Sequence, residues 1–312
     1  MLKLITRRLA WSVPLALAAS AASFLLVGML PGDAARSLLG QNATEQQLTE
    51  VRQQLGLNQP LVLQYWNWLI HALQGDLGTS LINKASVVEQ LNERLGASLS
   101  LIIGATVVSA VIGVALGVRG ALRGPAGKIV DAVSVLGLAV PDFWLGLVLV
   151  LVFAVQLAIF PPTGYVSPAL DTAAWFDSLV LPVVTLAVPA TAIVAKQARD
   201  AVATALSRPF TRTLRAAGVP EWSIIYRHAL KNAAVPILTV IGLVFVGALS
   251  GTVAVEFIFA IPGLGRTAVE ATSAHDFPLI QGVVVYFTLI VITVNLLVDL
   301  AYGYFNPRIR LS

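Results

Sequence analysis

The sequence holds few side chains that could carry out catalysis, and their spacing does not suit it. Cysteine is absent, and the three histidines, His71, His228 and His275, are widely separated along the chain. They do not have the spacing of metal ligands, and the HExxH zinc motif is missing. A nucleophile, a base and an acid cannot be assembled into a catalytic set either. The residue types therefore predict neither a metal site nor an enzyme.

Two glycine-containing runs look like nucleotide-binding motifs, but each lacks a required feature. Gly124-Pro125-Ala126-Gly127-Lys128 looks like a phosphate-binding loop, yet Leu122 stands where that loop needs glycine. Gly263 to Ala268 fits the dinucleotide pattern G-x-G-x-x-A, but it follows Pro262 in a predicted loop without a strand–helix–strand context. We therefore expect no nucleotide or other cofactor bound to this chain.

The composition indicates where such a chain resides. Of the 312 residues, 57% are hydrophobic and only 12% are charged, whereas soluble domains carry about 25% charged residues. One soluble core cannot bury so much apolar surface, because such cores stop growing at roughly 250–300 residues. A membrane-crossing helix needs about 20 mainly apolar residues. Six stretches qualify: 9–30, 96–118, 129–160, 178–195, 234–255 and 279–303. The sequence thus predicts an all-α polytopic membrane protein with six transmembrane helices.

Asp142 is the most deeply placed carboxylate in these stretches. An ionised group at this depth costs about 2.5–3.5 kcal/mol on insertion scales, which makes it a functional candidate. The stretch 129–160 would be about 48 Å long as one helix, and Pro141 could break it. Asp142 could then cap the restarted helix, or face a transport pathway and favour a cationic group such as a peptide amino terminus or a metal. Asp131 and Asp299 lie nearer the ends of their stretches, where pairing with basic groups would be structural.

The basic residues are unevenly distributed between the loops. Of the 20 Lys and Arg residues, 15 lie near the two termini or in the loops 119–128 and 196–233, whereas the loop 160–177 has none. Because Lys and Arg are enriched on the cytoplasmic side of membrane proteins, both termini are predicted to be cytoplasmic. The net charge of +4 follows from this asymmetry and indicates no nucleic-acid partner.

Four segments follow from these assignments. They are a cytoplasmic amino terminus with the first span (1–30), an external segment (31–95), a five-helix core (96–303) and a cytoplasmic tail (304–312). In the external segment, Thr44 and Gln47 form a capping box, Gly56 can end the helix that follows, and Leu61–Leu73 carries aromatic residues suited to the lipid interface. We expect a small helical cap on the outer surface.

Two glycine pairs have helical spacing in the predicted spans. They are Gly113 with Gly117 and Gly247 with Gly251. Such pairs permit close helix contact, but glycine is also common in membrane helices without that role.

The cytoplasmic loop 196–233 contains ordered helix signals rather than flexible filler. A basic helix is predicted to reach Thr213–Ala217, where Gly218 suits a left-handed turn that ends it. Pro220 suits the first turn of the next short helix. An ordinary basic loop that merely follows the charge rule is the alternative. A short helix held clear of the membrane favours docking into a groove on a soluble partner.

This loop resembles the cytoplasmic coupling loop of bacterial ABC importer permeases, in particular the first permease subunit of the dipeptide/oligopeptide/nickel group. The positions that match are Arg212, Thr213, Arg215, Ala216, Gly218, Glu221, His228, Asn232 and Pro236. Leu214 and Ala217 depart from the family pattern. The resemblance covers nearly the whole chain, including Leu30-Pro31-Gly32-Asp33, Gly75 to Ser80, Glu256 to Phe259, Pro262 to Arg266, Asn295 to Leu300 and Pro307 to Arg310.

The resemblance implies a type I ABC importer permease in the bacterial inner membrane. Its partners would be a second homologous permease, two ATP-binding cassette ATPases that hold ATP and Mg²⁺, and an external substrate-binding protein. By analogy, Thr213 to Ser223, with Pro220 among them, would dock in a groove of the ATPase. Glu256, with Pro262, Gly263 and Gly265, would form a gate or a contact with the binding protein.

The resemblance also implies the cargo, which we expect to be di- or oligopeptides. Nickel or another small solute is an alternative, because close relatives differ in cargo and specificity resides largely in the separate binding protein. A stand-alone ion-coupled transporter is a weaker alternative. It would normally need an internal charge relay and often inverted repeats, whereas this chain has one mid-membrane carboxylate and no convincing repeat.

Overall fold

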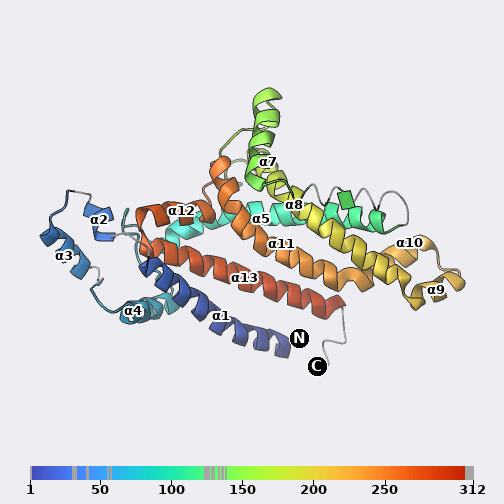
Figure 1. Cartoon of the computed structure of the whole chain (residues 1–312), viewed down its shortest axis with the longest axis horizontal. Helices are drawn as coiled ribbons and strands as arrows, with labels where there is room; N and C mark the ends of the chain where they lie inside the picture. Colours follow the sequence, from blue (N-terminus) through green and yellow to red (C-terminus); the bar gives the residue numbers. More distant parts are fainter. Residues whose placement is uncertain are drawn as a thin grey trace. The chain divides into compact units, whose positions relative to one another are not determined.

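The computed structural model describes residues 2–29, 34–39, 42–54, 56, 58–122, 127, 131–132, 134, 137 and 139–305. Within these residues the regular structure is helical, apart from an isolated antiparallel bridge between Thr79 and Ser86 (Figure 1). The motifs at 30–33 and 307–310, residues 306–312 of the predicted tail and most of the run 124–128 lie outside the described residues.

Five helical stretches of the described chain are long and apolar enough to cross a membrane. They are α1 (Leu2–Gly28), α5 (Val87–Ala121), α8 (Thr172–Ser207), a stretch ending in α11 (Leu230–Ile258), and α13 (Phe277–Phe305). The stretch before α11 consists of α10 (Glu221–Ser223) and the π-helical η2 (Ile224–Ala229). The all-α polytopic architecture is therefore confirmed, and five predicted spans coincide with these stretches.

The remaining predicted span, 129–160, lies partly outside the described residues. Its described part holds α7 (Asp142–Leu149), which continues as the π-helical η1 (Val150–Gln156). Pro141 precedes α7 with an extended backbone, φ −66° and ψ 137°, so a helix does start where the proline predicts. The predicted capping role of Asp142 is wrong, because Pro141 takes the cap position and Asp142 is already helical.

Residue contacts divide the chain into two compact units. Unit 1 comprises residues 1–5, 99–261 and 293–312, and contains α7, α8, α11 and most of α5. Unit 2 comprises residues 6–98 and 262–292. It contains most of α1, the short helices α2 (Ala34–Leu39), α3 (Glu45–Gln54) and α4 (Leu61–Leu73), and α12 (Leu264–Ala274).

In unit 1, α8 is the longest helix, with 36 residues that include Pro182 and Pro189. It begins at a strong cap, because the Asp171 carboxylate accepts hydrogen bonds from the backbone N–H of Ala173 and Ala174 at 2.8 and 3.1 Å. It ends where Pro209 opens the next helix. Helix α7 packs against α8 and α11, where Gly146 lies against Thr185 and Ile258, and the green stretch that follows α7 projects away from them in Figure 1.

The glycine pair on α5 lies at a close contact with α8. A Cβ atom on Gly117 would lie 2.6 Å from the Ala195 carbonyl oxygen and 2.6 Å from the Ala198 Cβ. One on Gly113 would lie 2.8 Å from two side-chain atoms of Val194. Any side chain larger than glycine would therefore push the two helices apart, and the predicted close contact is confirmed for this pair.

The glycine pair on α11 is different. Gly251 faces side-chain atoms of Leu186 and Asp142 at 3.1 and 3.3 Å from an added Cβ, but Gly247 has nothing within 4 Å. Only one of these two glycines is at a close contact among the described residues.

Unit 2 confirms the local predictions for the external segment. The Thr44 N–H donates to Gln47 Oε1 at 3.0 Å, and the Gln47 N–H donates to Thr44 Oγ1 at 3.3 Å, which is the predicted capping box at the start of α3. Gly56 has the left-handed φ of +68° expected of the residue that ends this helix, and α3 stops just before it, at Gln54. Helix α4 has the predicted bounds, and its Tyr65 hydroxyl forms a 2.9 Å hydrogen bond with Ser20 of α1.

The core of unit 2 lies where α5 and α13 meet α12. Its buried side chains include Leu77, Val87, Leu91, Leu264 and Leu279. Beside them the buried Asp276 carboxylate accepts hydrogen bonds from the Ser80 hydroxyl at 2.5 Å and the Leu81 N–H at 3.1 Å. These bonds fix the loop before α5 to the turn between α12 and α13.

Candidate functional site

The cytoplasmic loop predicted at 196–233 starts later than expected, because α8 continues to Ser207. Arg208 is extended, and Pro209 then opens α9 (Pro209–Ala216) in its first turn. Gly218 has φ +76°, so the predicted left-handed turn is confirmed. Pro220 was expected inside the next helix, but its ψ of 144° makes it the last extended residue before α10.

The inner side of this loop is built into the core of unit 1. Thr211 is fully buried, and its hydroxyl donates to the Ala205 carbonyl of α8 at 3.1 Å. Ile225 of η2 packs in one buried cluster with Val118 of α5, Val202 of α8 and Ile237 of α11. The inner side of the loop is therefore packed against three long helices of unit 1.

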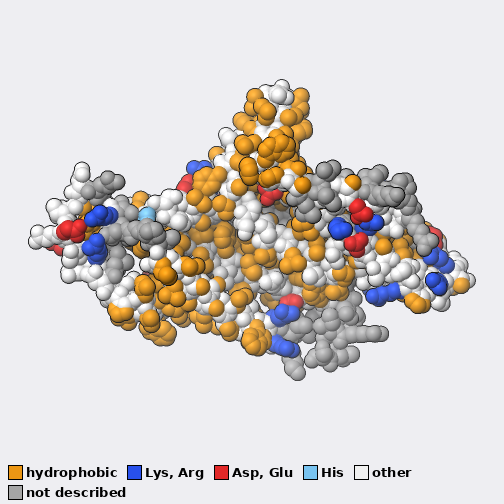
Figure 2. Space-filling model, viewed as in Figure 1, with side chains coloured by type: hydrophobic (Ala, Val, Ile, Leu, Met, Phe, Trp, Pro, Cys, Tyr) orange, Lys and Arg blue, Asp and Glu red, His pale blue; other side chains and the backbone are white. Residues whose placement is uncertain are grey.

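The outer side of the loop is exposed. The exposed residues include seven of the predicted coupling residues: Arg212, Thr213, Arg215, Ala216, Gly218, Pro220 and Glu221. Lys and Arg side chains gather over α9 in Figure 2. His228 is half-buried in η2, and the exposed Asn232 donates to its carbonyl at 2.9 Å. The structure thus brings the predicted coupling residues together on one connected loop.

An ion pair spans the Gly218 turn. Arg215 Nε donates to Glu221 Oε1 at 2.5 Å, and Nη2 donates to Oε2 at 3.3 Å. The hydrogen bond from Arg215 lowers the pKa of Glu221, and the same bond raises the pKa of Arg215. Both groups are exposed, so water screens the pair and its main effect is to hold α10 against α9.

Trp222 lies inside the predicted docking segment Thr213–Ser223, but sequence reasoning did not single it out. Its side chain is 66% exposed, directly before the buried Ser223, Ile224 and Ile225. The signal that could have identified it is the single tryptophan of this strongly basic loop, next to the start of the predicted short helix.

Asp142 lies half-buried at the start of α7. Its Oδ2 would be 3.3 Å from a Cβ on Gly251, so the carboxylate lies beside Gly251 of α11 but not against Gly247, which has nothing within 4 Å of an added Cβ. The neighbouring Phe143 and Trp144 are exposed, and hydrophobic side chains cover α7 in Figure 2. Contact between Asp142 and a transported cation stays a prediction.

The predicted gate residues fall into different units. Glu256 was expected to open an external loop, but it lies in the last turns of α11 and is fully buried. Its side chain is therefore covered in this structure, and its role as a gate or as a binding-protein contact stays a prediction. In unit 2, Pro262 is exposed, whereas Gly265 is buried and Gly263 caps α12.

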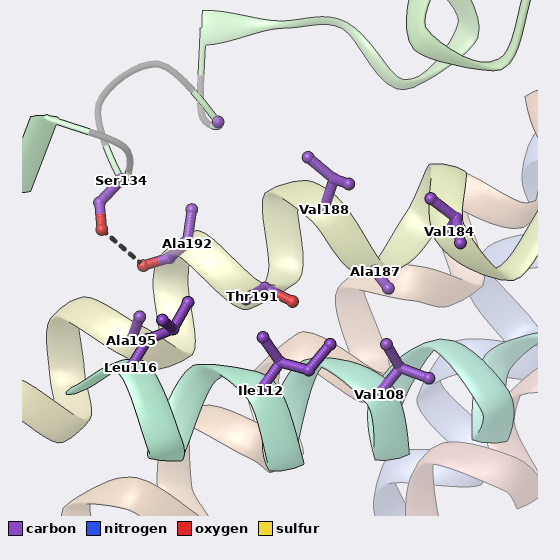
Figure 3. Close-up of a pocket in the computed structure, with 11 residues that line it drawn as sticks. Val108, Ile112, Leu116, Ser134, Val184, Ala187, Val188, Thr191, Ala192 and Ala195 are labelled. Carbon is purple, nitrogen blue, oxygen red and sulfur yellow. Dashed lines mark hydrogen bonds between the residues drawn. The ribbon is translucent and has the colours of Figure 1, made fainter. Parts of the chain in front are cut away.

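A pocket of about 320 Å³ lies between α5 and α8 (Figure 3). Its walls include Ile112 of α5 and Val188 of α8, and the Ser134 hydroxyl at its edge donates to the Ala192 carbonyl at 3.1 Å. The lining is almost wholly apolar, so the pocket offers van der Waals contact but no partner for a charged group. Among the described residues, no three His, Asp or Glu side chains are grouped closely enough to hold a metal ion.

Comparison with known proteins agrees with this architecture. The family model described as "Binding-protein-dependent transport system inner membrane component" matches residues 109–311, and the corresponding N-terminal model matches residues 1–102. A probable peptide ABC transporter permease of Sinorhizobium fredii is 40% identical over 92% of both chains. A putative peptide transport system permease of Brucella abortus is 36% identical, and a glutathione transport system permease of Salmonella choleraesuis is 37% identical, each over 99% of both chains. The chain therefore belongs to the family of binding-protein-dependent transport system inner membrane components.

Proposed function

We propose that this chain is the first of two permease subunits of an ABC importer that carries di- or oligopeptides into a bacterial cell. The named substrates of the relatives, peptides and glutathione, support a peptide cargo. The chain would form half of a translocation pathway that opens alternately to the two sides of the inner membrane. ATP and Mg²⁺ would be bound by two separate ATPase subunits, and cargo would be delivered by an external binding protein.

The proposed topology has six spans and two cytoplasmic termini. The apolar segment containing α7 and η1 would complete the sixth span, and the distribution of Lys and Arg supports the orientation. Residues 31–95 would then lie outside the cell, and the loop with α9 and α10 would lie in the cytoplasm.

The observation that carries the proposal is the two-sided loop between α8 and α11. Its outer side is exposed and basic, and its inner side is part of the core of unit 1. An ATPase that grips Thr213 to Ser223 would therefore move α8 and α11 together. This is the mechanical connection that an ATP-driven permease requires.

Cysteine labelling tests topology and docking together. Because the natural chain has no cysteine, Ala216→Cys carries one thiol on the loop, and Leu170→Cys carries one on the exposed segment before α8. In intact cells a membrane-impermeant maleimide should label Leu170→Cys and spare Ala216→Cys. In the assembled transporter a short crosslinker should join Ala216→Cys, but not Leu170→Cys, to the ATPase. The reverse pattern would refute the topology.

Coupling is tested with Gly218→Pro. Proline fixes φ at about −65° and cannot adopt the φ of +76° found here, so the turn should be lost and ATP hydrolysis uncoupled from uptake. Transport by the chain alone in vesicles, without ATP or partners, would contradict the proposal.

Mass spectrometry of the ligand held by the cognate binding protein tests the cargo, and nickel or a non-peptide solute there would refute the peptide assignment.

A further inference from the structure

Trp222 and Tyr226 are two large aromatic side chains exposed on the cytoplasmic loop. Their exposed fractions are 66% and 56%. A single exposed apolar residue is normal on any protein surface. Whether these two residues mark a contact with another protein depends on where they lie. Exposed aromatic residues of a membrane protein can also lie in the lipid headgroup layer.

The length of the helices places Trp222 beyond that layer. The charge-free part of the fifth predicted span begins at residue 234, twelve residues after Trp222, which is about 18 Å at 1.5 Å per helical residue. Helix α8 likewise continues eleven residues past Lys196, or about 16 Å. The headgroup layer is only about 5–8 Å thick on each side, and a typical tilt of about 20° shortens these lengths little. Trp222 therefore lies in water, where its exposed ring favours a protein partner over lipid.

The charges around Trp222 indicate what kind of partner. Between residues 207 and 233 the sequence has five basic residues and one acidic residue, Glu221, which is paired with Arg215. The other four are Arg208, Arg212, Arg227 and Lys231, all of them exposed and without an ion pair to any described residue. A complementary surface on the partner would be acidic.

We infer that Trp222 anchors this loop in an apolar pocket with an acidic rim on the partner ATPase. This inference rests on the proposed function and adds the residue that supplies most of the contact energy. Tryptophan, tyrosine and arginine are the residues that most often dominate protein interfaces. The Gly218 turn and the Arg215–Glu221 pair fix the helix that carries Trp222, so little conformational freedom is lost on docking.

The test uses the full chain with its second permease in lipid nanodiscs, and measures the affinity of the purified ATPase. Trp222→Ala should weaken binding roughly 30-fold or more, whereas Trp222→Phe should keep most of the affinity. Trp144→Ala is a matched control, because Trp144 is equally an exposed tryptophan but lies on α7. Wild-type binding should also weaken as salt is raised.

The outcomes separate this inference from the proposed function. If Trp222→Ala binds the ATPase as tightly as wild type while Ala216→Arg abolishes binding, the loop docks but Trp222 is not its anchor. If both variants bind like wild type, the proposed docking fails as well. A fluorophore on Trp222→Cys should be quenched by iodide and protected by the ATPase. Quenching by spin-labelled lipid instead would place residue 222 in the membrane and overturn the inference.

Discussion

Gly117 of α5 gives the sharpest test of the contact between α5 and α8. The change is Gly117→Ala, which adds a single methyl group to a membrane helix. That methyl would lie 2.6 Å from the Ala195 carbonyl oxygen and 2.8 Å from the Arg199 backbone nitrogen. Backbone atoms cannot rotate away as a side-chain end can, so the helices themselves would have to separate.

The expected cost follows from this geometry. Overpacking a filled contact costs about 1–3 kcal/mol, and a clash with backbone atoms belongs at the upper end of that range. Replacing glycine by alanine inside a helix gains about 1 kcal/mol, so the net destabilisation should be about 2 kcal/mol. Gly247→Ala is the matched control, because nothing lies within 4 Å of its added methyl. Gly247→Ala should therefore gain the stability that alanine gives a helix over glycine, without the cost of a clash.

Thermal unfolding of both variants in the same detergent measures this difference. At roughly 2–4 °C per kcal/mol, Gly117→Ala should lower Tm by about 4–8 °C and Gly247→Ala should raise it slightly. Equal melting temperatures for the two variants would refute the close packing of α5 against α8 at Gly117.

Three further predictions concern charged residues. Glu221→Arg should weaken ATPase binding and uptake several-fold, because it sets two like charges across the Gly218 turn. Adding Arg215→Glu to this variant should restore much of the lost binding and uptake. A double variant no better than the single one would rule out a role for the pair. The pair's stabilisation is present above the ordinary glutamate pKa of 4.5 and is lost only as pH falls through the lowered pKa of Glu221. The protection of the amides around Gly218, taken relative to their intrinsic exchange rates, should therefore fall at that lower pH in wild type but not in Glu221→Gln. Asp142→Asn should reduce uptake of peptides with a free amino terminus more than uptake of acetylated peptides, and equal uptake of both by variant and wild type would remove Asp142 from the pathway.

The features that sequence predicts well are those set by a few neighbouring residues. The Thr44–Gln47 capping box, the bounds of α4 and the left-handed Gly218 depend on side-chain and backbone preferences within one or two turns. Apolar stretches likewise predict the spans, because the bilayer requires them. The same stretches do not fix helix ends, since α8 continues past Lys196 to Ser207.

The features that sequence does not predict depend on distant partners. The sequence predicts that Asp131 pairs with a basic group, which Arg199 confirms, but it does not single out Arg199 as the partner. It gives no sign that Asp276 holds Ser80, which is 196 positions away. The burial of Glu256 depends equally on how α11 packs in its unit, and an isolated glutamate near a loop is more readily taken as exposed. Trp222 lies in the predicted docking segment, but its sequence context does not tell that it is exposed while Ile224 and Ile225 are buried.

The position of Pro189 within α8 has a mechanical consequence. It divides the helix into two nearly equal lengths of about 26 Å, from Thr172 to Pro189 and from Pro189 to Ser207. Proline removes a backbone hydrogen bond, so this point is a natural pivot. A helix pivoting there is a lever with equal arms, which reverses the direction of a movement without enlarging it. A displacement of the loop would then produce a displacement of about the same size at the far end of α8.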